Sequence, residues 1–120
     1  MHMKYVCLIY DEETKIDAMP KAESDAFLAE YFAFTNAIKT SGQYVAGQAL
    51  QPVQTATTVR VRNGKMSTTD GPFAETKEQL GGFYMIEARD LNEAIQVASK
   101  IPSAKIGSIE VRPIMTFEQP

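Results

Sequence analysis

Three carboxylates and two cations have residue types suited to acid–base chemistry on a small molecule. Asp70 and Glu75 lie five residues apart in the segment 69–82, and Glu110 and Arg112 lie two residues apart near the C-terminus. A carboxylate in a half-dry cleft can have its pKa raised and act as general acid or base, and an arginine can bind a ligand bidentately. We predict catalytic roles for Asp70, Glu75 and Glu110, and substrate-binding roles for Arg112, Lys77, Phe73 and Tyr10.

The same side chains also have a purely structural interpretation. Glu110 and Arg112 can pair with Lys77, with Glu75 or with a second copy of the chain as ordinary ion pairs. The segment around Asp70 likewise suits a connector that needs its turn residues for folding alone. Both interpretations stay open, because a sequence shows which charges are present and not how they are paired.

Nucleophilic and metal chemistry have little support in the sequence. Cys7 is the single cysteine, and its place in an apolar run predicts a buried, inert thiol. His2 is the only histidine and adjoins the N-terminus, where Met3 could be the natural start. The carboxylates lack ligand-like spacing, so no zinc or calcium site can be assigned, and we predict no metal and no cofactor.

The segment 69–82 should position most of the candidate residues. Asp70 is expected to accept hydrogen bonds from backbone N–H groups just downstream, and Pro72 fixes its own φ, so the Asp-Gly-Pro corner should be stiff. Residues 74–80 are good helix formers and are followed by two glycines, which end helices. We therefore predict a short helix over 74–80.

Apolar periodicity predicts the elements of the core. The runs 3–10 and 83–88 are apolar on both alternating sets, which is typical of central strands. A helix is predicted over 20–40, because apolar residues recur there at spacings of three and four before Gly42 ends it. We expect its apolar stripe to be core and not a ligand box: Phe27, Leu28, Tyr31, Phe32, Thr35 and Ile38.

A second helix is predicted to begin after Asp90, with Glu93 three residues on completing a capping box. Pro102 should end it. Before the first helix, the polar run 11–15 should be a loop, and residues 43–50 should be extended. The inward stripe of the second helix is expected to be Leu91, Ala94, Ile95, Ala98 and Ile101.

A β-hairpin is predicted between the two helices. Residues 57–62 alternate with a period of two, Asn63-Gly64 is a strong signal for a two-residue turn, and 65–69 form the returning strand. The two arginines of the hairpin share one face, which we expect to be solvated. The last strand should cover 108–115.

The expected order of elements is strand, helix, strand, inserted hairpin, strand, helix, strand. This order is typical of a ferredoxin-like α+β domain, βαββαβ, with a β-hairpin inserted between its repeats, and we assign residues 1–120 to one such domain. Both helices would cover one sheet face. The first and third core strands are apolar on the other face as well, so we expect a homodimer through the sheets, with Glu110 and Arg112 facing the cleft between them.

Charge and hydropathy exclude several classes of partner. The formal net charge is −3 and the pI is near 5.1, whereas nucleic-acid binding usually requires a basic face. The sequence has neither an apolar run long enough to cross a membrane nor a basic-then-apolar N-terminal signal. We expect a cytoplasmic protein that binds neither nucleic acid nor membrane.

One set of motifs runs through nearly the whole chain. Asp70-Gly71-Pro72-Phe73 is followed by Glu75, Lys77-Glu78 and Gly81-Gly82-Phe83, and the set also includes the strand 4–10, Gly42, Asn92-Glu93-Ala94 and the closing segment 107–113. Together they resemble the YCII-related proteins that carry the DGPF motif. The resemblance implies a dimeric α+β barrel in which two sheets enclose a cleft. Such a cleft would take a small polar or anionic ligand.

The resemblance leaves two functions open. Some YCII-like proteins resemble small lyases or dehydrochlorinases that transfer protons with a helix His and an Asp near the end of the second helix. This chain has Tyr31 and Phe32 near the first position and Ile101-Pro102 at the second. That mechanism is therefore not carried over, and lyase- or isomerase-like chemistry would need the carboxylates named above. The alternative is a non-catalytic regulatory or protein-interaction module linked to extracytoplasmic-function sigma factors or stress signalling.

Overall fold

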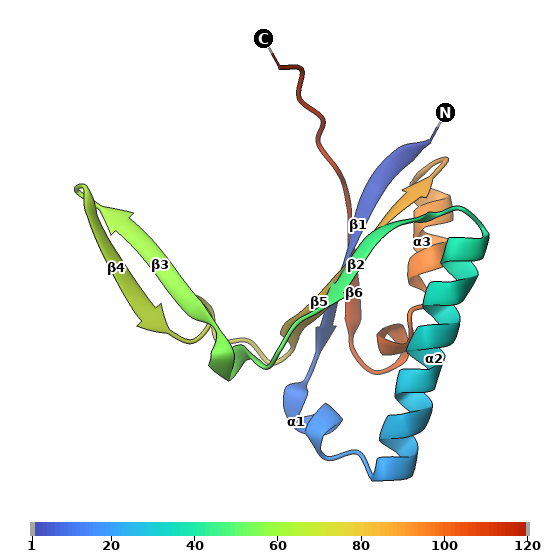
Figure 1. Ribbon diagram of the computed structural model, residues 1–120, viewed down its shortest axis with the longest axis horizontal. Helices are drawn as coiled ribbons and strands as arrows, with labels where there is room; N and C mark the ends of the chain where they lie inside the picture. Colours follow the sequence, from blue (N-terminus) through green and yellow to red (C-terminus); the bar gives the residue numbers. More distant parts are fainter. Residues whose placement is uncertain (1, 120) are drawn as a thin grey trace.

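The structure is a computed structural model that describes residues 2–119. Its main sheet is antiparallel, with the strand order β2-β5-β1-β6, and helices α2 and α3 lie against one of its faces (Figure 1). This arrangement confirms the ferredoxin-like α+β fold. The bounds are β1 Met3–Asp11, β2 Tyr44–Ala49, β5 Gln79–Ala88 and β6 Ser108–Pro113 for the strands, and α2 Lys21–Thr40 and α3 Leu91–Ala98 for the helices.

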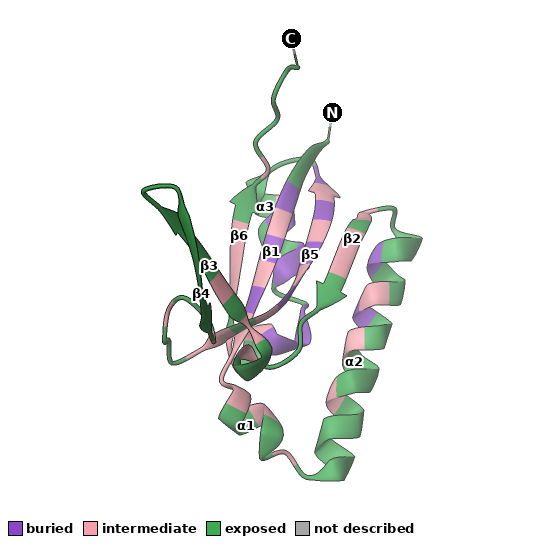
Figure 2. Cartoon of the chain, turned by 60° about the vertical axis from the view of Figure 1, so that its left-hand side comes forward, coloured by how far each residue is buried: buried purple, intermediate pink, exposed green. Residues whose placement is uncertain are grey.

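The two central strands, β1 and β5, build the core as predicted. Successive side chains of a strand point to opposite faces, and in β1 Tyr5, Cys7 and Ile9 are buried beneath the helices. Figure 2 shows the alternation of buried and half-buried residues along both strands. Burial raises the pKa of the Cys7 thiol to about 11, as expected for an inert cysteine.

In the part of the chain that the structure describes, the other face of the sheet carries no helix, and we call it the open face. Strand register places Val6 beside Met85 and Arg112, and Leu8 beside Phe83 and Glu110. Its side chains are mostly half-buried by their neighbours in the sheet. The open face includes Val6, Leu8, Tyr10, Phe83, Met85, Ser108, Glu110 and Arg112, with Lys4, Ala46, Gln48 and Glu87 at its margins.

Only the C-terminal half of α2 packs on the sheet. Phe34 and Ile38 are buried, and the Phe34 ring meets the Tyr84 ring edge-on at 5.1 Å between centroids. Leu28 and Phe32 are 54% and 62% exposed, so the expectation that the whole stripe is core was wrong. The nearby strand ends contain three glycines, Gly47, Gly81 and Gly82, and glycines contribute no side chains to fill the space below the helix.

The second helix is capped as predicted but presents a different face. Asp90 Oδ1 accepts a hydrogen bond from the Glu93 N–H at 2.9 Å, while the Glu93 carboxylate accepts from the N–H of Arg89 and not from that of Asp90. Leu91 and Ile95 are exposed, which contradicts the predicted inward stripe. Small side chains allow the helix to approach the sheet closely, and the buried set is Ala94, Val97, Ala98 and Ile101.

The segment before β5 is not helical, contrary to the prediction for 74–80. Strand β5 begins at Gln79 and includes the glycine pair. Gly82 is needed there for close packing, because a Cβ on it would lie 2.7 Å from the Gln48 carbonyl oxygen. The Gln79 side chain bonds the backbone carbonyl of Thr76 at 2.7 Å, so the loop is held by side-chain bonds instead of helical ones.

The Asp70 corner is also closed differently from the prediction. Within residues 2–119 the Asp70 side chain makes no hydrogen bond. An Asx turn would use the N–H two residues on, and Pro72 has none. The corner is held by the Gly71 N–H, which donates to the Ala56 carbonyl at 2.7 Å, and by Thr58 Oγ1, which donates to the Gly71 carbonyl at 2.8 Å. Gly71 has a φ of 100°, which favours glycine.

Strands β3 Thr57–Arg62 and β4 Lys65–Asp70 form the predicted hairpin, which projects from the body as an arm (Figure 1). Its turn residues Asn63 and Gly64 have φ values of 52° and 74°, as a type I′ turn requires. The last strand ends at Pro113, two residues earlier than predicted, and the Ile114 N–H that follows still donates to the Lys4 carbonyl at 2.9 Å.

A short helix, α1 Glu13–Asp17, replaces the loop predicted over 11–15. The Glu13 N–H at its start donates to the side-chain oxygen of Gln79 at 2.9 Å, and this long-range contact could not be anticipated from local sequence. Within residues 2–119, each helix is too short or too polar to pass through a bilayer.

Candidate functional site

A cavity of about 570 Å³ lies between α1, the N-terminal half of α2, and the ends of β2 and β5. Its size is in the range of small-molecule sites. It exists because α2 separates from the sheet where the strands contain glycine. Five aromatic side chains contribute to its wall: Phe27, Tyr31, Phe32, Tyr44 and Tyr84.

A hydrogen-bonded chain of three side chains meets this cavity at both of its ends. Ser103 is fully buried, and its hydroxyl donates to Asp11 Oδ2 at 2.7 Å. The Tyr31 hydroxyl is hydrogen-bonded to the same serine oxygen. A serine has one proton to give, so Tyr31 must be the donor of the second bond. Asp11 and Tyr31 line the cavity, and Ser103 joins them from behind.

The surroundings raise the pKa of both end groups. Desolvation raises the pKa of Asp11, the Ser103 hydrogen bond lowers it, and the nearby charge of Glu78 raises it. Burial raises the pKa of Tyr31 to about 12 against the lowering effect of Ser103. Asp11 Oδ1 is buried without a hydrogen-bond partner within residues 2–119. Asp11 is therefore an acid whose proton is held more tightly than usual, connected to a phenol that stays protonated.

Backbone geometry fixes this chain of side chains. Asp11 ends β1 just after a register irregularity at Ile9 and Tyr10, and Ser103 lies in a short 3₁₀ turn, Pro102–Lys105. The chain then passes so close to β1 that a Cβ on Gly107 would lie 2.1 Å from the Tyr10 carbonyl oxygen and 2.8 Å from Asp11 Oδ1. Glycine at this position lets the turn approach Asp11.

The charge of the cavity wall has one sign. Asp11, Glu13 and Asp17 line it, and no lysine, arginine or histidine among residues 2–119 does so. The Glu13 carboxylate accepts the Val53 N–H at 3.0 Å. A second polar pair lies in the wall, Thr35 with Tyr84 at 2.6 Å between their oxygens. This wall favours neutral or cationic ligands over anions.

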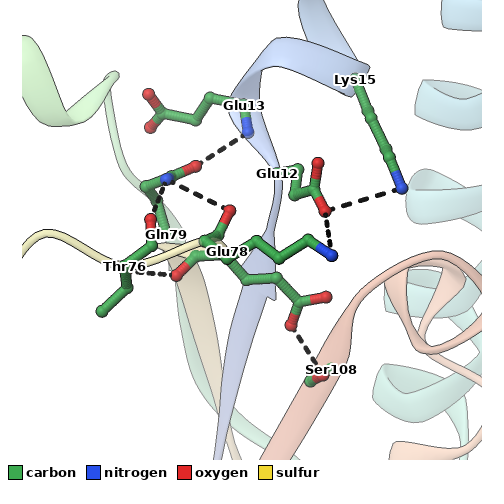
Figure 3. A network of polar contacts seen from close by, with 8 residues as sticks. Glu12, Glu13, Lys15, Thr76, Glu78, Gln79 and Ser108 are labelled. Atoms are coloured by element: carbon green, nitrogen blue, oxygen red, sulfur yellow. Dashed lines mark hydrogen bonds and ion pairs between the residues drawn. The ribbon is translucent and has the colours of Figure 1, made fainter.

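Polar contacts tie the 71–78 loop to α1 and β6 (Figure 3). Glu12 pairs with Lys15 at 3.6 Å and with Lys77 at 3.7 Å. The Glu78 carboxylate accepts the Ser108 hydroxyl at 2.7 Å. These pairs hold the loop beside the strand end that carries Asp11.

The residues predicted from sequence lie outside the α2 cavity, and their predicted roles stay a prediction. Glu110 and Arg112 are brought together as an ion pair on the open face, and Tyr10 lies on the same face beside Ser108. Lys77 pairs with Glu12. The other three, Asp70, Phe73 and Glu75, are exposed near the base of the arm, and no hydrogen bond or ion pair in residues 2–119 joins them to Glu110 or Arg112. None of the seven lines the cavity.

Sequence reasoning missed Asp11 and Ser103. Asp11 carried a usable signal, because it is an acid placed directly after a strand that is apolar on both faces. Ser103 carried none, since it meets Asp11 from 92 residues away. The spacing of Tyr31 predicts a place in the apolar stripe of the helix, and it does not predict the hydrogen bond that its hydroxyl makes to Ser103.

The profile of the YCII-related domain matches residues 3–118. The chain belongs to the YCII-related family. An uncharacterized protein of Rhizobium meliloti (strain 1021) is 36% identical over 118 residues, which cover 97% of this chain and 95% of the relative. In this YCII-related chain, Tyr31 lines the cavity at one of the two places where the sequence departs from the lyase-like pattern, and Ser103, which bonds Tyr31 from behind the wall, directly follows the other.

Proposed function

We propose that this YCII-related protein binds a small, mostly apolar molecule in the α2 cavity and exchanges a proton with it through Tyr31, Ser103 and Asp11. The observation that carries the proposal is the buried serine, which connects two ionisable groups of one aromatic cavity. Asp11 Oδ1 is buried without a hydrogen-bond partner within residues 2–119, which is a costly arrangement if the three residues serve packing alone.

The protonation state of Asp11 sets the direction of transfer. When Asp11 is ionised, a ligand hydroxyl can donate to Tyr31, and protons shift from Tyr31 to Ser103 and from Ser103 to Asp11. When Asp11 is protonated, the same bonds reverse and Tyr31 protonates a ligand oxygen. The raised pKa of Asp11 brings the second state closer to neutral pH. Proton donation to a carbonyl oxygen is the step that begins isomerase-like enolisation.

The ligand that fits this wall is neutral or cationic. An anion would be repelled by Asp11, Glu13 and Asp17 and would find no basic side chain in the wall to pair with. An ammonium group would be attracted both by these carboxylates and by the faces of the aromatic rings. This ligand differs from the polar or anionic one expected for the cleft between the sheets, which stays a prediction.

A matched series of ligands tests the binding part. Phenethyl alcohol, phenethylamine and hydrocinnamate share one aromatic skeleton and differ in charge. Titration followed by protein NMR should give dissociation constants for the alcohol and the amine at least about tenfold lower than for the carboxylate. Tyr31→Phe should weaken the binding of the alcohol more than the binding of the amine. Equal or tighter binding of hydrocinnamate would contradict the proposal.

Deuterium exchange tests the catalytic part. With phenylacetone in D₂O, Tyr31 protonates the carbonyl oxygen, the proton on the neighbouring carbon leaves to water, and Asp11 is reprotonated from solvent. The returning ketone then carries deuterium, which ¹H NMR detects. Wild type should accelerate the exchange, and Tyr31→Phe and Asp11→Asn should each abolish the acceleration. Binding without exchange in wild type would favour the alternative, a non-catalytic regulatory or interaction module.

We also propose that the protein is a bacterial, cytoplasmic homodimer of the DGPF-motif subgroup. The motif Asp70-Gly71-Pro72-Phe73 supports the subgroup. The dimer is supported by the open face, where Val6, Leu8, Phe83 and Met85 form an apolar strip that no helix within residues 2–119 covers.

A further inference from the structure

The arm formed by β3 and β4 has no core of its own. Every residue of β4 is exposed, and in β3 only Thr58 is half-buried. An isolated two-stranded hairpin is marginally stable in water, and it usually needs a third strand or a packed face. Within residues 2–119, no such face covers the arm, which leaves the body on the side of the open face (Figure 1).

The arm is two-sided. Strand register pairs Val59 with Thr68 and Val61 with Met66, which places the three apolar side chains on one face. Val59, Val61 and Met66 are 58%, 60% and 72% exposed. The opposite face carries the basic side chains Arg60, Arg62 and Lys65. A hairpin meant only to be solvated would not need one apolar face.

Charge separates the arm from the body. Residues 57–70 contain three basic side chains and one acidic one, which leaves the rest of the chain with nine basic against fourteen acidic. The arm of one copy and the body of another therefore attract each other. No partner outside this chain is needed to supply the complementary charge.

We propose that the arm is a clasp that lies on a second copy of the chain, with Val59, Val61 and Met66 buried against the partner. The inference rests on the proposed dimer. The arm and the open face are unpartnered in the same chain and lie on the same side of it, so one two-fold operation would cover both in each copy. Each arm would then gain the packed face that it lacks alone.

Two matched substitutions test the clasp. Val61→Lys puts a charge on the apolar face, and Ser67→Lys puts the same charge on the basic face. Both positions are exposed in the single chain, so both variants should keep the folded body. We expect sedimentation equilibrium to give a dimer dissociation constant at least about tenfold higher for Val61→Lys than for wild type, and at most a few-fold higher for Ser67→Lys.

Each other outcome overturns the clasp. A wild-type monomer at micromolar concentration would remove the dimer and the clasp together. If wild type is a dimer and Val61→Lys has the same dissociation constant, the clasp is wrong and the dimer forms through the sheets alone. Equal weakening by both substitutions would show that the apolar face is not the one that meets the partner.

Discussion

Ser103 differs from alanine by one oxygen, yet that oxygen holds two ionisable side chains in place. Its bonds to Asp11 and Tyr31 are made in a fully buried position, where neither partner can be replaced easily by bulk water. A buried polar group is stable only while its bonds are made. The serine, the aspartate and the tyrosine should therefore be treated as one unit in any mutational study of the cavity.

The raised pKa of Asp11 predicts a pH-dependent contribution to stability. Ionisation of Asp11 is less favourable in the folded protein than in the unfolded chain, so its carboxylate lowers the free energy of unfolding at pH values above its folded pKa. As the pH falls through that pKa toward the ordinary value of 3.8, the folded state binds the proton first and the penalty is lost.

The variant Asp11→Asn isolates this effect, because it removes the titration and keeps an oxygen for Ser103. We compare the free energies of unfolding of the variant and of wild type, measured with urea. The value for the variant minus that for wild type should be larger at about pH 7 than at about pH 4, because only wild type carries the penalty of an ionised Asp11. The matched control is Glu23→Gln, which makes the same change of charge at an exposed position in the first turn of α2. The same difference at both pH values for Asp11→Asn would contradict the raised pKa.

The corner at Asp70 and Gly71, at the base of the arm, is stabilised by the side chain of Thr58 and not by that of Asp70. Thr58 makes a side-chain bond across the corner, and Asp70 makes none to any other residue of 2–119. Thr58→Val should therefore lower the free energy of unfolding by about 1 kcal/mol, and Asp70→Ala should change it by less than about 0.5 kcal/mol. Thermal and urea denaturation of both variants check this. A larger loss for Asp70→Ala would restore the Asx-turn account of the motif.

Local sequence predicts elements whose signals lie within a few residues. The apolar runs of β1 and β5, the Asn63-Gly64 turn and the Asp90 cap are of this kind, and all are confirmed. The 74–80 helix failed because Gly82 packs against β2 and Gln79 bonds α1, and both contacts are long-range. The cavity was missed for the same reason, since it forms where a distant helix meets strand ends that contain glycine.

At the scale of the molecule, two apolar surfaces lack a cover within residues 2–119. One is the open face of the sheet and the other is the apolar face of the arm. The α2 cavity lies mainly toward the helices, so a second copy seated on the open face would leave much of it accessible. Ligand binding and dimerisation can therefore be tested separately, with different variants.

Leu8 and Cys7 are neighbours in β1 that test the open face. Leu8→Lys places a charge on that face, where the long side chain can reach water in a single chain, so the variant should fold but dissociate to a monomer. Cys7→Lys places the same charge in a fully buried site between the sheet and the helices and should unfold the protein. Sedimentation and circular dichroism distinguish these outcomes, and a Leu8→Lys variant that remains dimeric would place the interface elsewhere. An unfolded Leu8→Lys variant would show that this face needs its partner for folding.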